Sequence, residues 1–382
     1  MIEAEHSPIA PSSADIWMNC PGSVAMQAAQ PPEEETEESR EGTAAHWLLE
    51  QILLKLTVAP DAIAPNGVPI NDEMRAAVRE LVDDVIATTG QIKPGDFFQV
   101  EQKIAAPTMI HPDFFGTPDV YTVLWSRKTV HIHDFKYGHL FVDVYRCLQL
   151  IGYAAMVIET EQIPDWREWA FTFTIAQPRC YARDELGGTL REWFTSGEKL
   201  APLFEDMRRG ALAARTPGAP CVTGDHCTHC RAAWDCEANQ RAGGVALAIA
   251  NGQQSSGMNA HALGLEARTL ARAADFIKAR LGSVDAKIQE LINQKTDVPW
   301  HTIGYSKPRL VWDKKKQAEA AQFVAMFGVD VVPGVSIPTP ADCMKQGVDE
   351  TVISPYTTKA PAAQKLIRVE DNRAEKIFGR RD

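Results

Sequence analysis

Two strand-like runs joined by a short basic turn are the feature that most constrains how this chain can fold. Residues 118–125 (PDVYTVLW) and 129–135 (TVHIHDF) are rich in the β-branched and aromatic residues that favour strands, which predicts a β-hairpin. The hairpin nevertheless carries Asp119 near its start and Asp134 at its end, with Lys136 just beyond. A buried charge is costly unless it is paired or bound to a metal ion. These three residues therefore indicate a functional site.

Helical and strand-like segments alternate around this hairpin. A helix is expected at about 43–56 and another at 72–89, where Asn71 is a candidate cap and Gly90 a stop. The other segments expected in the first part of the chain are a strand at 97–104, a helix at 142–159, a strand at 168–176 and a helix at 191–214. This order predicts an α/β fold with one central sheet and flanking helices.

The character of the sequence changes after Gly243. The elements expected beyond it are a linker at 251–259 (NGQQSSGMN), an alanine-rich amphipathic helical hairpin at 260–294, a β-hairpin at 300–312, a helix at 315–327 and a Pro-rich tail. The sequence therefore predicts two domains, residues 1–243 and residues 244–382. The second is expected to be a mainly helical extension, and its role is not evident from the sequence.

Composition and charge exclude several classes of protein. The 382 residues are 45% hydrophobic and 23% charged, which is ordinary for a globular protein. No apolar run approaches about 18 residues, and the N-terminal stretch lacks the features of a signal peptide. We therefore expect a cytoplasmic protein without a membrane partner. The net charge of −11 argues against a broad, non-specific coat of nucleic acid, although a local basic groove is compatible with it.

The charged residues of the hairpin are expected to converge. Asp134 and Lys136 lie two residues apart and so point to the same face of the sheet, while Asp119 begins the neighbouring strand. This arrangement suits a hard cation such as Mg²⁺ or Mn²⁺, and the lysine can then stabilise an attacked phosphate. The short patterns alone are weak, because acid-x-Lys and Pro-Asp each occur four times in the chain. Only here do they lie on successive strand-like runs.

Further motifs resemble those of the PD-(D/E)XK nucleases, in their RecB-like branch. These motifs are the opening SSADIWMNCP at 12–21, GTAAH ending at His46, Glu101 in QVEQKI, and Q-x-x-x-Y formed by Gln149 and Tyr153. The resemblance covers about residues 11 to 240. It implies a restriction-endonuclease-like core with a mixed central sheet and flanking helices.

The resemblance also implies roles for these residues. His46, Asp119, Asp134 and the backbone carbonyl of Phe135 would hold one or two Mg²⁺ ions, while Lys136 would position or deprotonate the attacking water. Gln149 and Tyr153 would grip the DNA strand or orient the site, and Arg146, expected one helical turn before them, could reach a phosphate. Taken singly, His46 also fits a core histidine, and Gln149 and Tyr153, spaced i and i+4, also fit simple packing.

Members of this family act mainly as DNA exonucleases. By resemblance, we expect a role in phage recombination, replication or repair. The expected partners are DNA and a phage single-strand-binding or annealing protein, and self-association into a homo-oligomer is also expected. Two alternatives stay open, namely a DNA-binding or assembly protein with a nuclease-like fold, and a structure-specific endonuclease. The complete set of His, Asp, Asp and Lys favours an enzyme.

Four of the eight cysteines cluster at Cys221, Cys227, Cys230 and Cys236, which indicates a metal site in a reducing compartment. The last three, together with the distant Cys20, resemble the staple of AddB-type nucleases, in which four cysteines hold a [4Fe–4S] cluster. The alternative is a structural Zn²⁺ bound by the four clustered cysteines, including Cys221.

Overall fold

The computed structural model describes residues 6–31, 35–90, 92–180, 188–250, 259–305, 310–313, 316–328, 339–359 and 364–368. The chain divides into two compact units, of which unit 1 is built on Met1–Cys221 and unit 2 on the residues from Val222 onward. The domain boundary after Gly243 stays a prediction.

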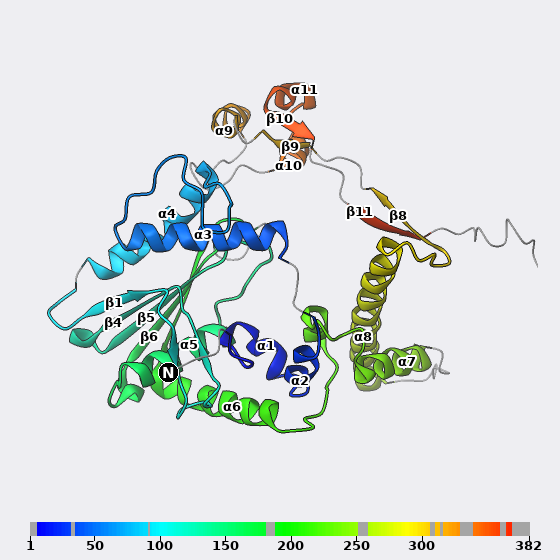
Figure 1. Ribbon diagram of the computed structural model, residues 1–382, viewed down its shortest axis with the longest axis horizontal. Helices are drawn as coiled ribbons and strands as arrows, with labels where there is room; N and C mark the ends of the chain where they lie inside the picture. The colour runs from blue at the N-terminus through cyan, green and yellow to red at the C-terminus, as the bar shows by residue number, and fades with distance from the viewer. Residues whose placement is uncertain are drawn as a thin grey trace, which may run out of the picture. The chain divides into compact units, whose positions relative to one another are not determined.

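Unit 1 is built around a five-stranded sheet in the order β1-β4-β5-β6-β7 (Figure 1). The β5 and β6 strands pair in parallel, while the other three pairs are antiparallel, so the sheet is mixed. The expected α/β fold with one central sheet is therefore confirmed. The strands are β1 (Phe97–Val100), β4 (Val120–Leu124), β5 (Thr129–Phe135), β6 (Ala170–Ala176) and β7 (Leu190–Ser196).

Helices cover both faces of this sheet (Figure 1). On one face, α3 (Glu37–Leu53) and α4 (Asp72–Thr89) share an apolar cluster with sheet residues that include Phe135. On the other face, α5 (Leu148–Thr160) and α6 (Gly197–Arg215) share a second cluster with the sheet. The short elements of unit 1 are η1 (Pro11–Ser13), α1 (Ala14–Trp17), α2 (Ser23–Ala28), β2 (Ile104–Ala105), β3 (Phe115–Gly116), η2 (Trp125–Arg127) and η3 (Trp166–Glu168).

The helix at 72–89 begins and ends at the expected residues. The Asn71 side chain accepts a hydrogen bond from the Met74 backbone at 2.8 Å, and acidic residues occupy the first turn, where the helix dipole favours them. The buried Met74, Ala77, Val78 and Leu81 recur at helical spacing, so one face of α4 packs against the sheet.

Two other expected helices begin later than the sequence suggests. The helix at 142–159 begins at Leu148, and the residues before it form an irregular segment in which Arg146 has a φ of 56°. The helix at 191–214 begins at Gly197, because Leu190–Ser196 forms β7 and pairs with β6. The expected strand at 97–104 ends at Val100. Strand pairing overrides the helical pattern at Leu190–Ser196. At the other two places a residue with positive φ, Arg146 or Glu101, interrupts the expected element.

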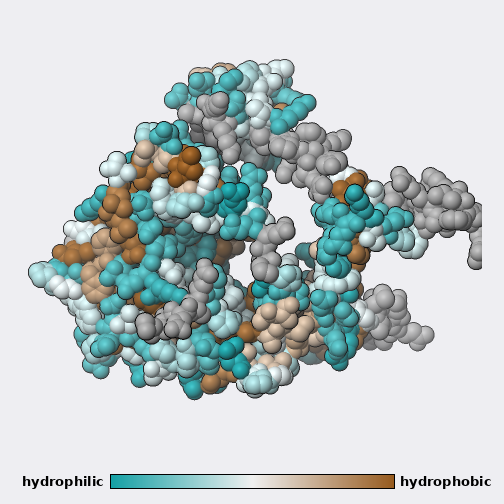
Figure 2. Space-filling view, in the orientation of Figure 1, coloured by the Kyte–Doolittle hydropathy of each residue, from teal (hydrophilic) through white to brown (hydrophobic). Residues whose placement is uncertain are grey.

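Unit 2 differs from its expected pattern at two places. The expected helical hairpin at 260–294 is one continuous helix, α8 (Ala260–Asn293), capped by Asn259. The surface of α8 that is turned toward the viewer in Figure 2 is largely hydrophilic. Only two of its alanines, Ala273 and Ala279, are buried. The expected β-hairpin at 300–312 is also wrong, because β8 (His301–Tyr305) and β9 (Leu310–Trp312) pair with later strands and not with each other.

The later strands of unit 2 come from the stretch expected to be a Pro-rich tail. The remaining elements are η4 (Asp225–His229), α7 (Glu237–Ala250), α9 (Gln317–Ala325), α10 (Pro340–Lys345), α11 (Glu350–Ile353), η5 (Ser354–Tyr356), β10 (Thr357–Lys359) and β11 (Gln364–Arg368). Nearly all of the expected linker at 251–259 lies outside the described residues. Across the described segments, no helix has both the length and the apolar composition needed to cross a membrane.

Candidate metal centre

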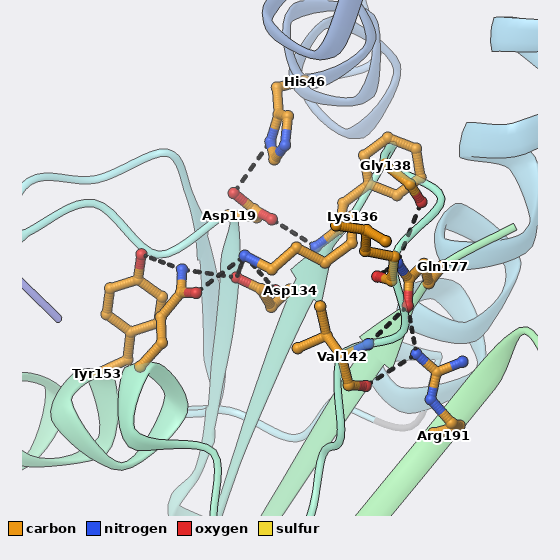
Figure 3. Close-up of polar contacts among 12 residues, drawn as sticks. His46, Asp119, Asp134, Lys136, Gly138, Val142, Tyr153, Gln177 and Arg191 are labelled. Carbon is orange, nitrogen blue, oxygen red and sulfur yellow. Dashed lines mark hydrogen bonds and ion pairs between the residues drawn. The ribbon is translucent and has the colours of Figure 1, made fainter. Parts of the chain in front are cut away.

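The register of the β4–β5 hairpin brings its acidic residues together. Val120 lies opposite His133, so the residue that precedes β4 lies beside the end of β5. As a result, the Asp119 Oδ2 atom accepts a hydrogen bond from the backbone nitrogen of Phe135 at 2.5 Å (Figure 3). The sequence predicted that Phe135 contributes its carbonyl. The contact seen here is made by its nitrogen, and the role of the carbonyl stays a prediction.

His46 on α3 lies on the other side of Asp119. Its Nδ1 atom is 3.1 Å from Asp119 Oδ1 (Figure 3). The same atom is 3.7 Å from Glu101 Oε1. One ligand atom from each of these three residues lies within 4.8 Å of the others, which is close enough for them to hold one metal ion. Two carboxylates and an imidazole form a donor set suited to a divalent cation.

The electrostatics of this cluster match those of a cation site. Burial alone would lower the pKa of His46, but the Asp119 carboxylate outweighs it and, with Glu101, raises that pKa to about 10. Burial alone would raise the pKa of Asp119, yet the charge and hydrogen bond of His46 hold it below its ordinary value. Burial raises the pKa of Glu101. In the metal-free protein, the proton on His46 thus supplies the positive charge that these acids need.

Asp134 and Lys136 form a second group on the face of the sheet covered by α5. The Lys136 Nζ atom is 3.0 Å from Asp134 Oδ2 and donates to Gln149 Oε1 at 2.9 Å. The Gln149 amide nitrogen donates to Asp134 Oδ1 and to the Tyr153 hydroxyl oxygen, both at 3.0 Å (Figure 3). The four predicted residues are therefore brought into one hydrogen-bonded network.

Burial sets the charge of this network. It raises the pKa of Asp134, against the opposing effect of Lys136, and the nearby Asp119 adds to the rise. Burial alone would lower the pKa of Lys136, but Asp134 and Asp119 outweigh it and raise that pKa, so the side chain stays an ammonium. Burial also raises the pKa of Tyr153 well above its ordinary range, which keeps its hydroxyl protonated.

Sequence reasoning missed two residues that shape the site, Gln177 and Arg191. The buried Gln177 side chain donates to the carbonyls of Gly138 and Leu140 and accepts from the Val142 backbone nitrogen. Arg191 donates to Gln177 Oε1 at 2.7 Å and to the Val142 carbonyl at 3.0 Å (Figure 3). The pair thus fixes loop 138–142, which begins two residues after Lys136. A polar glutamine directly after an apolar strand was the available signal.

Arg146 does not lie where the sequence suggested. It was expected on a helix one turn before Gln149, but it precedes the first residue of α5 and has a left-handed backbone conformation. The expectation of a helical turn between Arg146 and Gln149 is therefore wrong, while the contact of Arg146 with a phosphate stays a prediction.

The cysteines are distributed over both units. None of the eight, all of which lie within the described ranges, forms a disulfide bond. In unit 1, the Gly22 nitrogen donates to the Pro220 carbonyl at 2.9 Å, and a Cβ added at Gly22 would lie 2.7 Å from the Cys221 Sγ atom. The turn after Cys20 thus packs closely on the segment that ends at Cys221. Cys227, Cys230 and Cys236 belong to unit 2, so the four-cysteine assignment stays a prediction from spacing.

Comparison with known families gives a match along most of the chain. A family model described as "Protein of unknown function (DUF2800)" matches residues 6–374. The chain belongs to this family. The DUF2800 match extends over both compact units, and its description states no activity.

Proposed function

We propose that this DUF2800 protein is a metal-dependent deoxyribonuclease of the PD-(D/E)XK superfamily, in its RecB-like branch. One observation carries the proposal. The β4–β5 hairpin joins the cluster of His46, Glu101 and Asp119 to the adjoining network of Asp134 and Lys136. A cluster that can bind a cation, lying beside a partly buried ammonium, provides the groups needed to hydrolyse a phosphodiester bond.

The donor set fits Mg²⁺ or Mn²⁺. Carboxylate oxygens are the ligands that both ions prefer, and the imidazole of His46 is compatible with Mn²⁺. His46, Asp119 and Asp134, with Glu101 and the Phe135 carbonyl, would hold one or two such ions. When bound, the metal would supply Lewis acidity and lower the pKa of water.

The residues of the second group have separate tasks in this proposal. Lys136 keeps its charge, so its ammonium can stabilise a phosphate oxygen or orient the attacking water. Gln149 contacts both Lys136 and Asp134 and thereby fixes the distance between them. The protonated Tyr153 hydroxyl accepts from Gln149 and has its own proton to donate, which suits contact with the DNA backbone.

We also propose that Cys20, Cys227, Cys230 and Cys236 hold a [4Fe–4S] cluster, as the resemblance to AddB-type nucleases implies. The C-x2-C-x5-C spacing of Cys227, Cys230 and Cys236 supports this, because thiolates are the ligands of such clusters. Structural Zn²⁺ bound with Cys221 is the competing assignment. In either case the metal would hold segments of the chain together and would need no redox role.

The substrate and setting follow from the same resemblance. DNA is the proposed partner, and exonucleolytic degradation during phage recombination, replication or repair in the cytoplasm of a bacterial host is the proposed role. A phage single-strand-binding or annealing protein would work beside it, and the enzyme could act as a homo-oligomer.

Digestion of end-labelled linear DNA and of closed circular DNA, each with Mg²⁺ or with EDTA, tests the proposal. Mg²⁺-dependent loss of the linear DNA alone is the expected result. Cutting of the circle as well would identify an endonuclease. DNA binding without cleavage of either substrate would identify a DNA-binding or assembly protein and would overturn the enzymatic proposal.

A further inference from the structure

A second polar cluster lies on the opposite face of β5 from Asp134. His131 and His133 alternate with Asp134 along the strand, so they share the face on which Phe135 packs with α3 and α4. Their rings are stacked, with centroids 3.9 Å apart and planes 24° apart. The His133 Nε2 atom is 3.0 Å from the Oδ2 atom of Asp84 on α4.

Two atoms in this cluster are buried without a partner. His133 is fully buried, and its Nδ1 atom has no hydrogen-bond partner among the described residues. Thr122 lies directly opposite His131 in the β4–β5 register, and its buried Oγ1 atom likewise has no partner in the described part of the chain. An unsatisfied buried polar atom costs roughly 1–3 kcal/mol, so two on one face of the sheet point to a missing ligand.

We propose that Asp84, His131 and His133 form a second metal site, for Zn²⁺ or a similar transition-metal ion. One ligand atom from each residue lies within 4.8 Å of the others. Two imidazoles and one carboxylate form a catalytic-type zinc donor set, whereas Mg²⁺ prefers oxygen ligands alone. The site is chemically distinct from the centre at Asp119 and does not depend on the proposed nuclease function.

The surroundings supply what such a site needs. The His131 Nε2 atom contacts Thr174 Oγ1 at 2.8 Å, and a hydrogen bond at this nitrogen orients the imidazole when the other nitrogen binds an ion. That other nitrogen, Nδ1, lies 3.3 Å from Thr88 Oγ1, a longer contact that an ion would replace. Asp84 is partly exposed, which gives an ion a path from solvent. Zinc–nitrogen bonds are about 2.0–2.1 Å long, so the ligand atoms must draw somewhat closer. The bound ion would link α4 to the centre of the sheet.

Calorimetric titration of the full chain with Zn²⁺, after dialysis against EDTA and in excess Mg²⁺, tests the proposal. The decisive comparison is between Asp84→Asn and Asp83→Asn. Both variants remove one negative charge from the same turn of α4, but Asp83 is exposed and outside the cluster. Any zinc bound by the cysteines is common to both variants, so it cancels. Asparagine at position 84 still offers an oxygen to His133, which preserves the fold.

We expect the native protein and Asp83→Asn to bind one more Zn²⁺ than Asp84→Asn, or to bind that ion more than about tenfold more tightly, since even loss of an outer-shell partner costs about 10–100-fold. Zn²⁺ should also raise the melting temperature of the native protein and of Asp83→Asn more than that of Asp84→Asn. Equal stoichiometry and affinity in all three proteins would overturn the proposal.

A check that needs no variant is the Co²⁺ spectrum of the native protein. Tetrahedral cobalt held by nitrogen and oxygen ligands should appear in addition to any thiolate-bound cobalt. Absence of that species would also overturn the proposal.

Discussion

Replacing Lys136 by methionine tests how unit 1 keeps a carboxylate buried. The Lys136 Nζ atom lies 3.0 Å from Asp134 Oδ2, and Asp134 is only 2% exposed. Methionine keeps much of the side-chain length but removes the charge. Because Lys136 is what opposes the effect of burial on the pKa of Asp134, the substitution raises that pKa further. We expect Asp134 to fold as a protonated acid in the variant.

The loss of folding stability follows from the free energy needed to protonate Asp134 at the pH of the measurement. An unperturbed aspartate has a pKa of about 3.9, and each pH unit above it adds about 1.36 kcal/mol to the cost of protonation. The loss of stability is thus at most about 4 kcal/mol at pH 7, similar to the roughly 3–5 kcal/mol lost when a buried pair loses one partner. At pH 5 the limit falls to about 1.5 kcal/mol.

The sign of the pH dependence is fixed by the raised pKa. A carboxyl group whose folded pKa lies above its unfolded value contributes stability below the unfolded pKa, and this contribution is lost as pH rises through the folded pKa. The stability deficit of Lys136→Met relative to the native protein should therefore grow between pH 5 and pH 7.

Urea unfolding at several pH values in this range measures the deficit, with EDTA present so that no cation replaces the ammonium. Lys128→Met is the matched control. Its Nζ atom pairs with Glu168 Oε2 at 2.8 Å before the start of β5, but both side chains are exposed. Such pairs contribute less than about 1 kcal/mol. Equal deficits in the two variants, or a deficit for Lys136→Met that does not change with pH, would refute the reasoning.

Other predictions concern the loop, the tyrosine and the cysteines. Gln177→Leu removes four hydrogen bonds from the loop 138–142 region and should cost at least about 2 kcal/mol in thermal unfolding, whereas a native melting curve would contradict the positioning role. Tyr153→Phe should slow DNA cleavage roughly tenfold at unchanged stability. An unchanged rate would show that Tyr153 only packs in the site and does not contact the substrate. Protein purified without oxygen should be brown, with about four irons per chain. Cys20→Ser should bleach and destabilise it, while Cys221→Ser should do neither. One zinc and no iron, with the zinc released by Cys221→Ser but not by Cys20→Ser, would favour the zinc site.

The parts of the fold that could be predicted from the sequence depend on local signals. The β4–β5 hairpin follows from two runs of β-branched and aromatic residues around a short turn, and α4 follows from its cap at Asn71 and its helical periodicity. Once the hairpin is given, its register alone brings Asp119 next to Phe135. The approach of Asp119 to the end of β5 is therefore a local property of the chain. His46 on α3 and Gln149 on α5 reach the hairpin only through contacts between distant segments.

The parts that could not be predicted depend on contacts between distant segments. The apolar residues of 142–147 fit a helical period, but Gln177, directly after β6, and Arg191, in β7, hold the preceding loop. As a result, α5 begins only after Arg146. The LREWFTS segment becomes β7 because β6 offers it an edge to pair with. In unit 2, β8 pairs with β11 rather than with the nearby β9, and no local pattern announces that choice.

The central claim is tested most directly by the rate at which Asp119→Ala degrades end-labelled linear DNA in excess Mg²⁺. Asp119 contacts both His46 and Phe135, and the loss of a metal contact of about 4 kcal/mol corresponds to roughly a thousandfold. Asp134→Ala and Lys136→Ala should behave alike.

Asp113→Ala is the control for this measurement, because Asp113 shares the Pro-Asp pattern but pairs with Arg215 at 2.7 Å on the surface. We predict a roughly thousandfold loss for Asp119→Ala in a folded protein and a rate within about threefold of native for Asp113→Ala. A rate for Asp119→Ala within about tenfold of native, or no Mg²⁺-dependent degradation by the native protein, would contradict the account.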